Sequence, residues 1–329
     1  MKFSNFGPLF LAIGLGLFVG HGQADITATN LFETIPSGTD GNCVGKPIDT
    51  MVQEAVMLND KAIAAINVLL EPKLFWSGGN DERIAKIASA IWGVQLDKPM
   101  IYAGFRFRID DSGRDTLTKA KTNYELANEK LNSNSVNGGK LTCGGKDWQY
   151  VATWEDLGYK GNTEPVDKYV SKYFSQKDDQ GRYIIEPGKI IITEQTRNGK
   201  SLAGKSLCDD PGRAQTWTVS HLIMMCDQCF DQPTLSTLEG QQGSWPSGKH
   251  MDDIQTAGAE FQHEMLHYIG KGIGDTDMGN GEAGYGWENC AIIASQPGQL
   301  ALKNADNYRV FAMAVFFSQI SWDEYGEKP

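Results

Sequence analysis

Apolar side chains recur at helical spacing in several long stretches of the chain. The clearest stretch is 48–70, which contains no glycine or proline and predicts an amphipathic helix. A second helix is predicted at 81–94, where two acidic residues favour a helix N-terminus. Residues 116–131 predict a more polar helix. Helical spacing returns at 252–270, where an aspartate at the start can act as the N-cap and a glycine suits the C-terminal end.

Short apolar runs bounded by turn residues predict strands between these helices. They fall at 101–109, 189–193 and 216–225. Residues 133–146 and 236–250 are rich in glycine and polar residues and predict loops. Helices towards both ends with short strands between them indicate an α+β fold, mainly helical with a small sheet. No linker divides 25–329, so we predict a single domain.

The first 24 residues have the pattern of a secretory signal peptide. Lys2 is followed by an apolar run at 8–19, and Gly22 and Ala24 are the small residues that a signal peptidase recognises. The apolar run is too short for a membrane span, although a retained N-terminal anchor is the alternative. We therefore expect a secreted, extracellular protein whose mature chain starts at Asp25.

The charge balance limits the partners of the chain. It has 30 basic and 41 acidic residues, a formal net charge of −11. An acidic chain of this kind has no basic surface for nucleic acid or anionic lipid. We expect neither nucleic acid nor membrane as a partner.

The cysteines predict disulfide bonds. The chain has six, and an even number behind a signal peptide suggests up to three disulfides, with the pairing left open. Cys226 and Cys229 form a C-x-x-C, which is also half of a common zinc site. No second pair of cysteines or histidines completes such a site, so disulfide bonding is the favoured interpretation.

Residues 263–267 form the motif H-E-x-x-H within a predicted helix. His263 and His267 are four residues apart, so they project from adjacent turns of one helix face and can bind one zinc ion. Glu264 is rotated by about 100° from His263, which brings its carboxylate beside the metal and makes it a candidate general base. The alternative is a solvated His/Glu cluster without a metal.

Zinc bound by two histidines needs a third protein ligand and an open position for water. Three acids follow the motif in a glycine-rich segment: Asp275, Asp277 and Glu282. The other histidines of the mature chain, His221 and His250, lie upstream, where a single histidine is more often structural. Each acid has a solvated loop carboxylate as its alternative role.

Several of these elements together resemble a known family. H-E-M-L-H at 263–267, Tyr285-Gly286, and N-A-D-N-Y at 304–308 followed by F-A at 311–312 are similar to the deuterolysin-type metalloendopeptidases. These are the aspzincins, which include the fungal peptidyl-Lys metalloendopeptidases. The family pairs H-E-x-x-H with G-T-x-D-x-x-Y-G and then with A-x-x-N-A-D-x-Y-x-x-F-A. The likeness is strong over 263–312.

The resemblance implies a zincin-like fold and a His-His-Asp zinc site. It makes His263 and His267 ligands, Glu264 the general base and Tyr285 the stabiliser of the oxyanion. The sequence departs from the family at the aspartate, because Tyr285 lies eight residues beyond Asp277 instead of three. Alignment backward from Tyr285 puts a glutamate, at 282, where the family has aspartate. Of the three acids, the two aspartates rank equally and the glutamate third.

We therefore expect a secreted zinc-dependent metalloendopeptidase that hydrolyses peptide bonds in protein or peptide substrates. An edge strand within 216–225 can hold an extended substrate. The alternative is a secreted zinc-binding protein without proteolytic activity, antigen-like or acting in host interaction. A disulfide-rich structural protein without metal is a third class.

Overall fold

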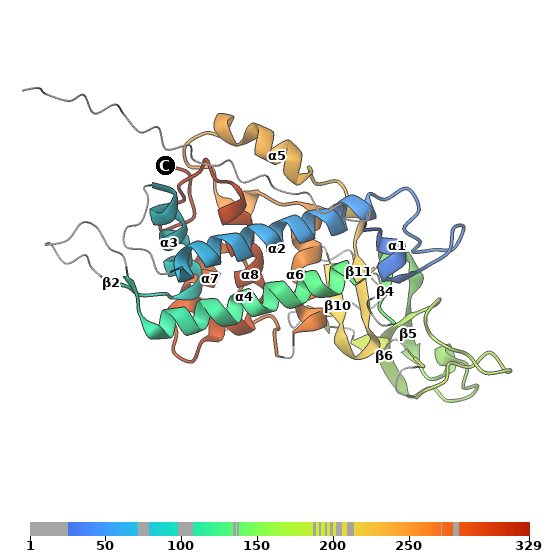
Figure 1. Cartoon of the computed structure of the whole chain (residues 1–329). Helices are drawn as coiled ribbons and strands as arrows, with labels where there is room; N and C mark the ends of the chain where they lie inside the picture. Colours follow the sequence, from blue (N-terminus) through green and yellow to red (C-terminus); the bar gives the residue numbers. More distant parts are fainter. Residues whose placement is uncertain are drawn as a thin grey trace, which may run out of the picture.

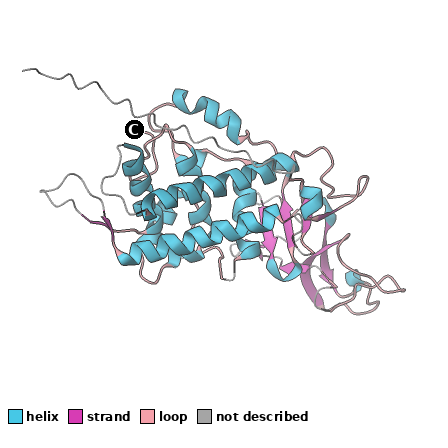
Figure 2. Cartoon of the chain, in the orientation of Figure 1, coloured by secondary structure: helices cyan, strands magenta, loops and turns pink. Residues whose placement is uncertain are grey.

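The structure is a computed structural model, and it describes residues 26–71, 79–97, 108–133, 136, 138–186, 189–190, 192–194, 196–197, 200–201, 206–208, 214–270, 272–278 and 283–329. The predicted signal peptide, most of the predicted strand at 101–109 and Glu282 lie outside these residues. Helices are the main regular structure of the described chain. Most strands lie at one end of the long helices, and the short β2–β3 pair lies at the other end (Figures 1 and 2). The predicted α+β class, mainly helical with a small sheet, is confirmed.

The α-helices in the described residues are α1 (Ala28–Leu31), α2 (Ile48–Leu70), α3 (Gly79–Trp92), α4 (Asp111–Asn132), α5 (Leu235–Gln241), α6 (Ala257–Ile269), α7 (Gly286–Ser295) and α8 (Ala305–Phe316). The prediction for 48–70 matches α2 at both ends. The helix predicted at 81–94 lies two residues earlier, as α3. α4 begins five residues before the predicted start, because the side chain of Asp110 caps it by accepting from Gly113 N at 2.6 Å.

The main sheet is mixed and has the order β1-β4-β11-β10. Its strands are β1 (Glu33–Thr34), β4 (Lys140–Cys143), β10 (Ala214–Trp217) and β11 (Leu222–Met225). β4 pairs in parallel with β1 and β11, and β10 pairs antiparallel with β11. A second, antiparallel sheet contains β5 (Trp148–Thr153), β6 (Pro165–Ser171) and β7 (Ile192–Glu194). Two short pairs complete the set, β2 (Leu96–Asp97) with β3 (Arg108–Ile109), and β8 (Thr196–Arg197) with β9 (Lys200–Ser201).

Three sequence predictions need correction in this region. The single strand predicted at 216–225 is a hairpin, since a 3₁₀ turn at Thr218–Ser220 separates β10 from β11. The loop predicted at 133–146 contains β4, and the loop predicted at 236–250 contains most of α5. β4 is too short to show a period, and α5 is a short polar helix capped by Thr234.

The core is organised around α8, all twelve residues of which are buried. α2, α3, α6 and α7 pack against it, and α4 runs beside α2 (Figure 1). A second apolar cluster lies where α2 and α6 meet one face of the main sheet, through Phe261 and Met265 of α6. The other face of that sheet packs against the second sheet, and there the rings of Trp148 and Trp217 lie 4.6 Å apart.

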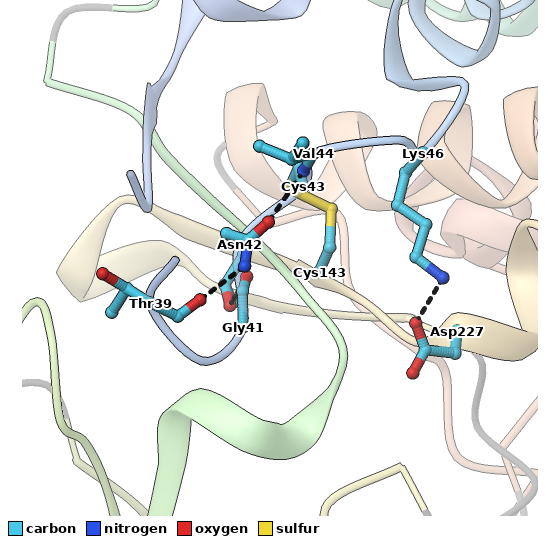
Figure 3. The surroundings of a disulfide bond; sticks show 9 residues. Thr39, Gly41, Asn42, Cys43, Val44, Lys46, Cys143 and Asp227 are labelled. Carbon is cyan, nitrogen blue, oxygen red and sulfur yellow. Dashed lines mark hydrogen bonds and ion pairs between the residues drawn. A yellow bond between two sulfur atoms is a disulfide. The ribbon is translucent and has the colours of Figure 1, made fainter. Parts of the chain in front are cut away.

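Two disulfides are formed, fewer than the three that the sequence allowed. Cys43 bonds to Cys143 at the end of β4, and Cys208 bonds to Cys226 (Figure 3 shows the first). Cys229 and Cys290 are buried and belong to neither bond. Within the C-x-x-C, Cys226 is therefore in a disulfide, as favoured, but its partner is not Cys229. Disulfides are typical of oxidising compartments such as the extracellular space. Among the described helices none has the length and apolar character of a membrane span.

Candidate metal centre

The motif helix, α6, is fixed by its ends and by its apolar face. Thr256 caps it by accepting from Ala259 N at 3.0 Å, so the helix begins later than the predicted cap at 252–253. Those two residues belong instead to a 3₁₀ turn. Gly270 follows the last helical residue, as predicted. Phe261 and Met265 anchor one face in the core, and this orients the histidines on another face.

Three donor atoms converge beside this helix. His263 Nε2 lies 3.0 Å from His267 Nε2, and the two nitrogens lie 3.3 and 3.2 Å from Asp275 Oδ1. Donors 2.0–2.1 Å from a tetrahedral zinc ion lie about 3.3 Å apart. His263, His267 and Asp275 are thus placed to hold a metal ion.

The second nitrogen of each imidazole faces an oxygen acceptor. His267 Nδ1 lies 3.3 Å from the carbonyl oxygen of Ile273, and His263 Nδ1 lies 3.3 Å from Asp306 Oδ1. Metal-binding histidines usually have such an acceptor on the distal nitrogen, because it fixes the tautomer and the ring orientation. The Nε2 atom of each histidine is therefore the one that can coordinate a metal ion.

The structure distinguishes two of the three acids that the sequence left open. Asp275 joins the cluster, whereas Asp277 is not part of it and pairs through its backbone with Ala283. Glu282 lies outside the described residues. His221 and His250 are not in the group either. The ring of His221 packs on Tyr268 at 5.7 Å, and His250 Nδ1 accepts from Asp252 N at 3.1 Å.

Asp275 reaches the cluster because its loop pairs with the start of α8. Gly274 N donates to Lys303 O at 2.8 Å, and Gly274 O accepts from Ala305 N at 2.9 Å. The side chain of Asn304 lies between two parts of the loop. Its Oδ1 accepts from Thr276 N at 3.0 Å, and its Nδ2 donates to Gly284 O at 2.8 Å. The buried Asn304 thus fixes the backbone on one side of Asp275.

The histidines and Asp275 share strong electrostatic interactions. Burial raises the pKa of Asp275, but hydrogen bonds and charge from His263 and His267 lower it by more, so it ends well below its usual range. Burial lowers the pKa of His263, and the carboxylates of Asp275 and Asp306 raise it by more. Such a cluster of anionic and imidazole donors attracts a cation.

Glu264 is buried beside the cluster. Its side chain is 5% exposed, and Oε2 has no hydrogen-bond partner among the described residues. Burial raises its pKa, while His263 and His267 lower it in part. A buried carboxylate oxygen without a donor is an available proton acceptor. The main-chain carbonyl of Glu264 accepts from Thr216 Oγ1 at 3.1 Å, and this ties α6 to β10.

Tyr285 is the residue immediately before α7, and its side chain extends to the cluster. Its hydroxyl donates to Asp275 Oδ2 at 2.7 Å, and its ring centroid lies 5.8 Å from that of His263. The side chain is 41% exposed, so its hydroxyl lies at the border between the cluster and solvent.

Sequence reasoning did not assign a role to Asp306, which lies behind His263. Arg309 Nε and Nη2 donate to its two carboxylate oxygens at 2.6 and 3.1 Å. Burial raises the pKa of Asp306, but Arg309 and His263 lower it by more. The signal was in the sequence, because an Asp and an Arg three residues apart in a helix of otherwise buried residues require each other as partners.

Comparison with family models, with curated proteins and with solved structures finds no match to this chain. The functional class is therefore inferred from the residues of the site and from their geometry.

Proposed function

We propose that this protein is a secreted zinc metalloendopeptidase. The observation that carries the proposal is the convergence of His263 Nε2, His267 Nε2 and Asp275 Oδ1 within 3.0–3.3 Å of one another. Two imidazoles and one carboxylate are a donor set typical of catalytic zinc, which keeps a fourth position open. The resemblance of 263–312 to the aspzincins supports the same class. The signal-peptide pattern and the two disulfides support secretion.

The protein side chains have distinct roles in the proposed hydrolysis. A bound zinc ion would supply Lewis acidity towards the scissile carbonyl and would lower the pKa of water. Glu264 accepts the proton of the attacking water through its unpaired oxygen and passes it to the leaving amine. Tyr285 would turn its single hydroxyl hydrogen bond from Asp275 Oδ2 to the developing oxyanion, for which its half-exposed position at the edge of the cluster is suited.

The position of β10 favours a peptide as the substrate. β10 is the terminal strand of the described four-stranded sheet and packs against α6. An extended peptide can add to such an edge through main-chain hydrogen bonds. Because Thr216 of β10 is bonded to the carbonyl of Glu264, a peptide on this edge lies next to the catalytic helix. Of the strand predicted at 216–225, only the part that belongs to β10 lies at this edge of the sheet.

The test is the variant Glu264→Gln, which keeps the shape of the side chain and removes the base. We expect zinc to remain bound at one ion per chain, measured by elemental analysis. Cleavage of a reduced, carboxymethylated protein should fall at least about 100-fold, the usual lower limit for loss of a general base. Glu288→Gln is the control, since Glu288 is exposed on the neighbouring α7. Equal cleavage by Glu264→Gln and wild type would show that the peptidase function is wrong.

The two alternative classes correspond to other outcomes of the same measurements. A wild-type protein that binds one zinc ion and cleaves no protein is a non-proteolytic zinc-binding protein. A folded protein that binds no stoichiometric zinc belongs to the structural class.

A further inference from the structure

Asp306 is a buried carboxylate that contacts two parts of the candidate site at once. It is 1% exposed. Its Oδ1 lies 3.3 Å from His263 Nδ1, and its Oδ2 accepts from Gly286 N at 2.6 Å. Arg309 fills the remaining positions, with one contact to each oxygen. Cys290 Sγ also lies 3.8 Å from Oδ2, so each oxygen contacts Arg309 and at least one further group of the surroundings.

A buried ion pair needs an explanation beyond stability. Apolar residues of similar volume are often as stable as a buried Asp–Arg pair, because both charges lose their hydration. The pair sits on α8, the most buried helix, and its further described ion-pair partners are His263, 3.3 Å from Asp306 Oδ1, and Glu260, 3.8 Å from Arg309 Nη1. The position of this ion pair is explained by two contacts that Asp306 makes outside it, with His263 Nδ1 and with Gly286 N.

The first contact acts on the metal ligand. The carboxylate of Asp306 lies 3.3 Å from Nδ1 as an ion-pair contact, without the alignment of a full hydrogen bond, and its charge holds this edge of the His263 ring so that Nε2 is directed to the cluster. The second contact acts on the tyrosine. Gly286 is the residue after Tyr285 and has a φ of +83°, a conformation that favours glycine. Holding the N–H of Gly286 sets the direction in which the chain leaves Tyr285 and enters α7.

We propose that Asp306 is a positioning residue that orients His263 and Tyr285 together, so that the metal site and the tyrosine form one rigid unit. The part that concerns Tyr285 rests on the proposed function, whereas the part that concerns His263 holds for any bound metal. Arg309 has a supporting role, because its two-pronged contact prevents rotation of the carboxylate.

The chain offers a matched control at the same helix end. Asp252 Oδ1 accepts from Trp287 N at 2.8 Å, so Asp252 also caps α7 with a carboxylate. Asp252 Oδ2 lies 3.4 Å from His250 Nδ1, whereas the carboxylate beside His263 Nδ1 is that of Asp306. Replacement of Asp252 by Asn therefore removes a charge at the start of α7 and leaves the acceptor of His263 in place.

The experiment compares Asp306→Asn with Asp252→Asn by competition for Zn²⁺ against a chromophoric chelator. We expect Asp306→Asn to weaken zinc affinity 10- to 100-fold, the usual effect of losing such an outer partner. Asp252→Asn should leave the affinity unchanged. At saturating zinc, Asp306→Asn should also lower kcat with KM unchanged, because Tyr285 acts in the transition state. Equal affinity in wild type and Asp306→Asn, or equal losses in both variants, overturns the proposal.

A second variant keeps the test decisive if Asp306→Asn fails to fold, which circular dichroism in the presence of chelator will show. Arg309→Lys retains the positive charge but loses the forked donor, so the carboxylate can rotate. We expect a several-fold loss of zinc affinity, and an unchanged affinity overturns the proposal. Zinc binding that depends on Asp306 in a chain without proteolytic activity contradicts only the proposed function. A wild-type chain that binds no zinc contradicts both.

Discussion

The disulfide between Cys43 and Cys143 should contribute more to stability than the one between Cys208 and Cys226. The first joins residues 100 positions apart, and the second joins residues 18 apart. A cross-link stabilises mainly by removing conformations of the unfolded chain, and the effect grows with loop length. The chain-entropy relation gives about 4.7 kcal/mol for the longer loop and about 3.2 kcal/mol for the shorter one.

The perturbation replaces both cysteines of one bond by alanine, so that no single thiol remains. Cys43→Ala/Cys143→Ala should then lower the free energy of unfolding by about 1.5 kcal/mol more than Cys208→Ala/Cys226→Ala. The ion pair between Lys46 and Asp227, beside the first bond in Figure 3, does not replace the cross-link. Lys46 is partly exposed and Asp227 is exposed, and ion pairs open to solvent contribute at most about 1 kcal/mol.

Urea unfolding followed by tryptophan fluorescence measures the difference, from the midpoint and the slope m of each variant. Loss of a cross-link should also increase m, because the unfolded chain exposes more surface. An equal or larger loss of stability in the Cys208→Ala/Cys226→Ala variant would refute the loop-length reasoning. It would show that native packing around the bonds, and not unfolded-chain entropy, decides their contributions.

Two further predictions concern the contact between α2 and α6. A Cβ on Gly258 would lie 2.3 Å from Glu54 Cβ and 3.2 Å from Met51 O, so Gly258→Ala should destabilise by about 1–3 kcal/mol in urea unfolding. Gly240→Ala is the control, because nothing lies within 4 Å of its added Cβ and it should be neutral or stabilising. Burial raises the pKa of Glu54 above 4.5, although its hydrogen bonds from Leu235 and Gly258 lower it in part. The native state therefore binds this proton more tightly than the unfolded chain, and the resulting stabilisation, complete below the unfolded pKa, is lost as the pH rises through the folded pKa. The stability of Glu54→Gln relative to wild type should thus increase from about pH 4 to about pH 7, and a constant difference would contradict this assignment.

The sequence predicted those elements whose signals are local. The 48–70 helix matches α2 at both ends, because its apolar period is long and a proline follows Glu71. The prediction of one continuous strand at 216–225 was wrong, because apolar content alone does not show where the chain reverses direction. Val219, 85% exposed at the turn, is apolar without being part of the core.

The choice between the two aspartates could not be made from the sequence. Asp275 and Asp277 are two residues apart, so in an extended loop both side chains project to the same side. What separates them is the pairing of Gly274 and Thr276 with residues at the start of α8. That contact joins residues about 30 positions apart and leaves no local pattern. In contrast, His263, Glu264 and His267 were predictable because one helix fixes their spacing.

The central position of α8 has a consequence for biosynthesis. α2 lies near the start of the described chain and packs against α8, which lies near its end. The apolar faces of α2 and α6 therefore stay uncovered until α8 has been synthesised, and contacts of such long separation form late in folding. A nascent chain that stops before α8 contains all three candidate metal ligands. It lacks Asn304 and Asp306, which contact the loop of Asp275 and the ring of His263, so the candidate metal centre cannot be complete before α8 has been synthesised.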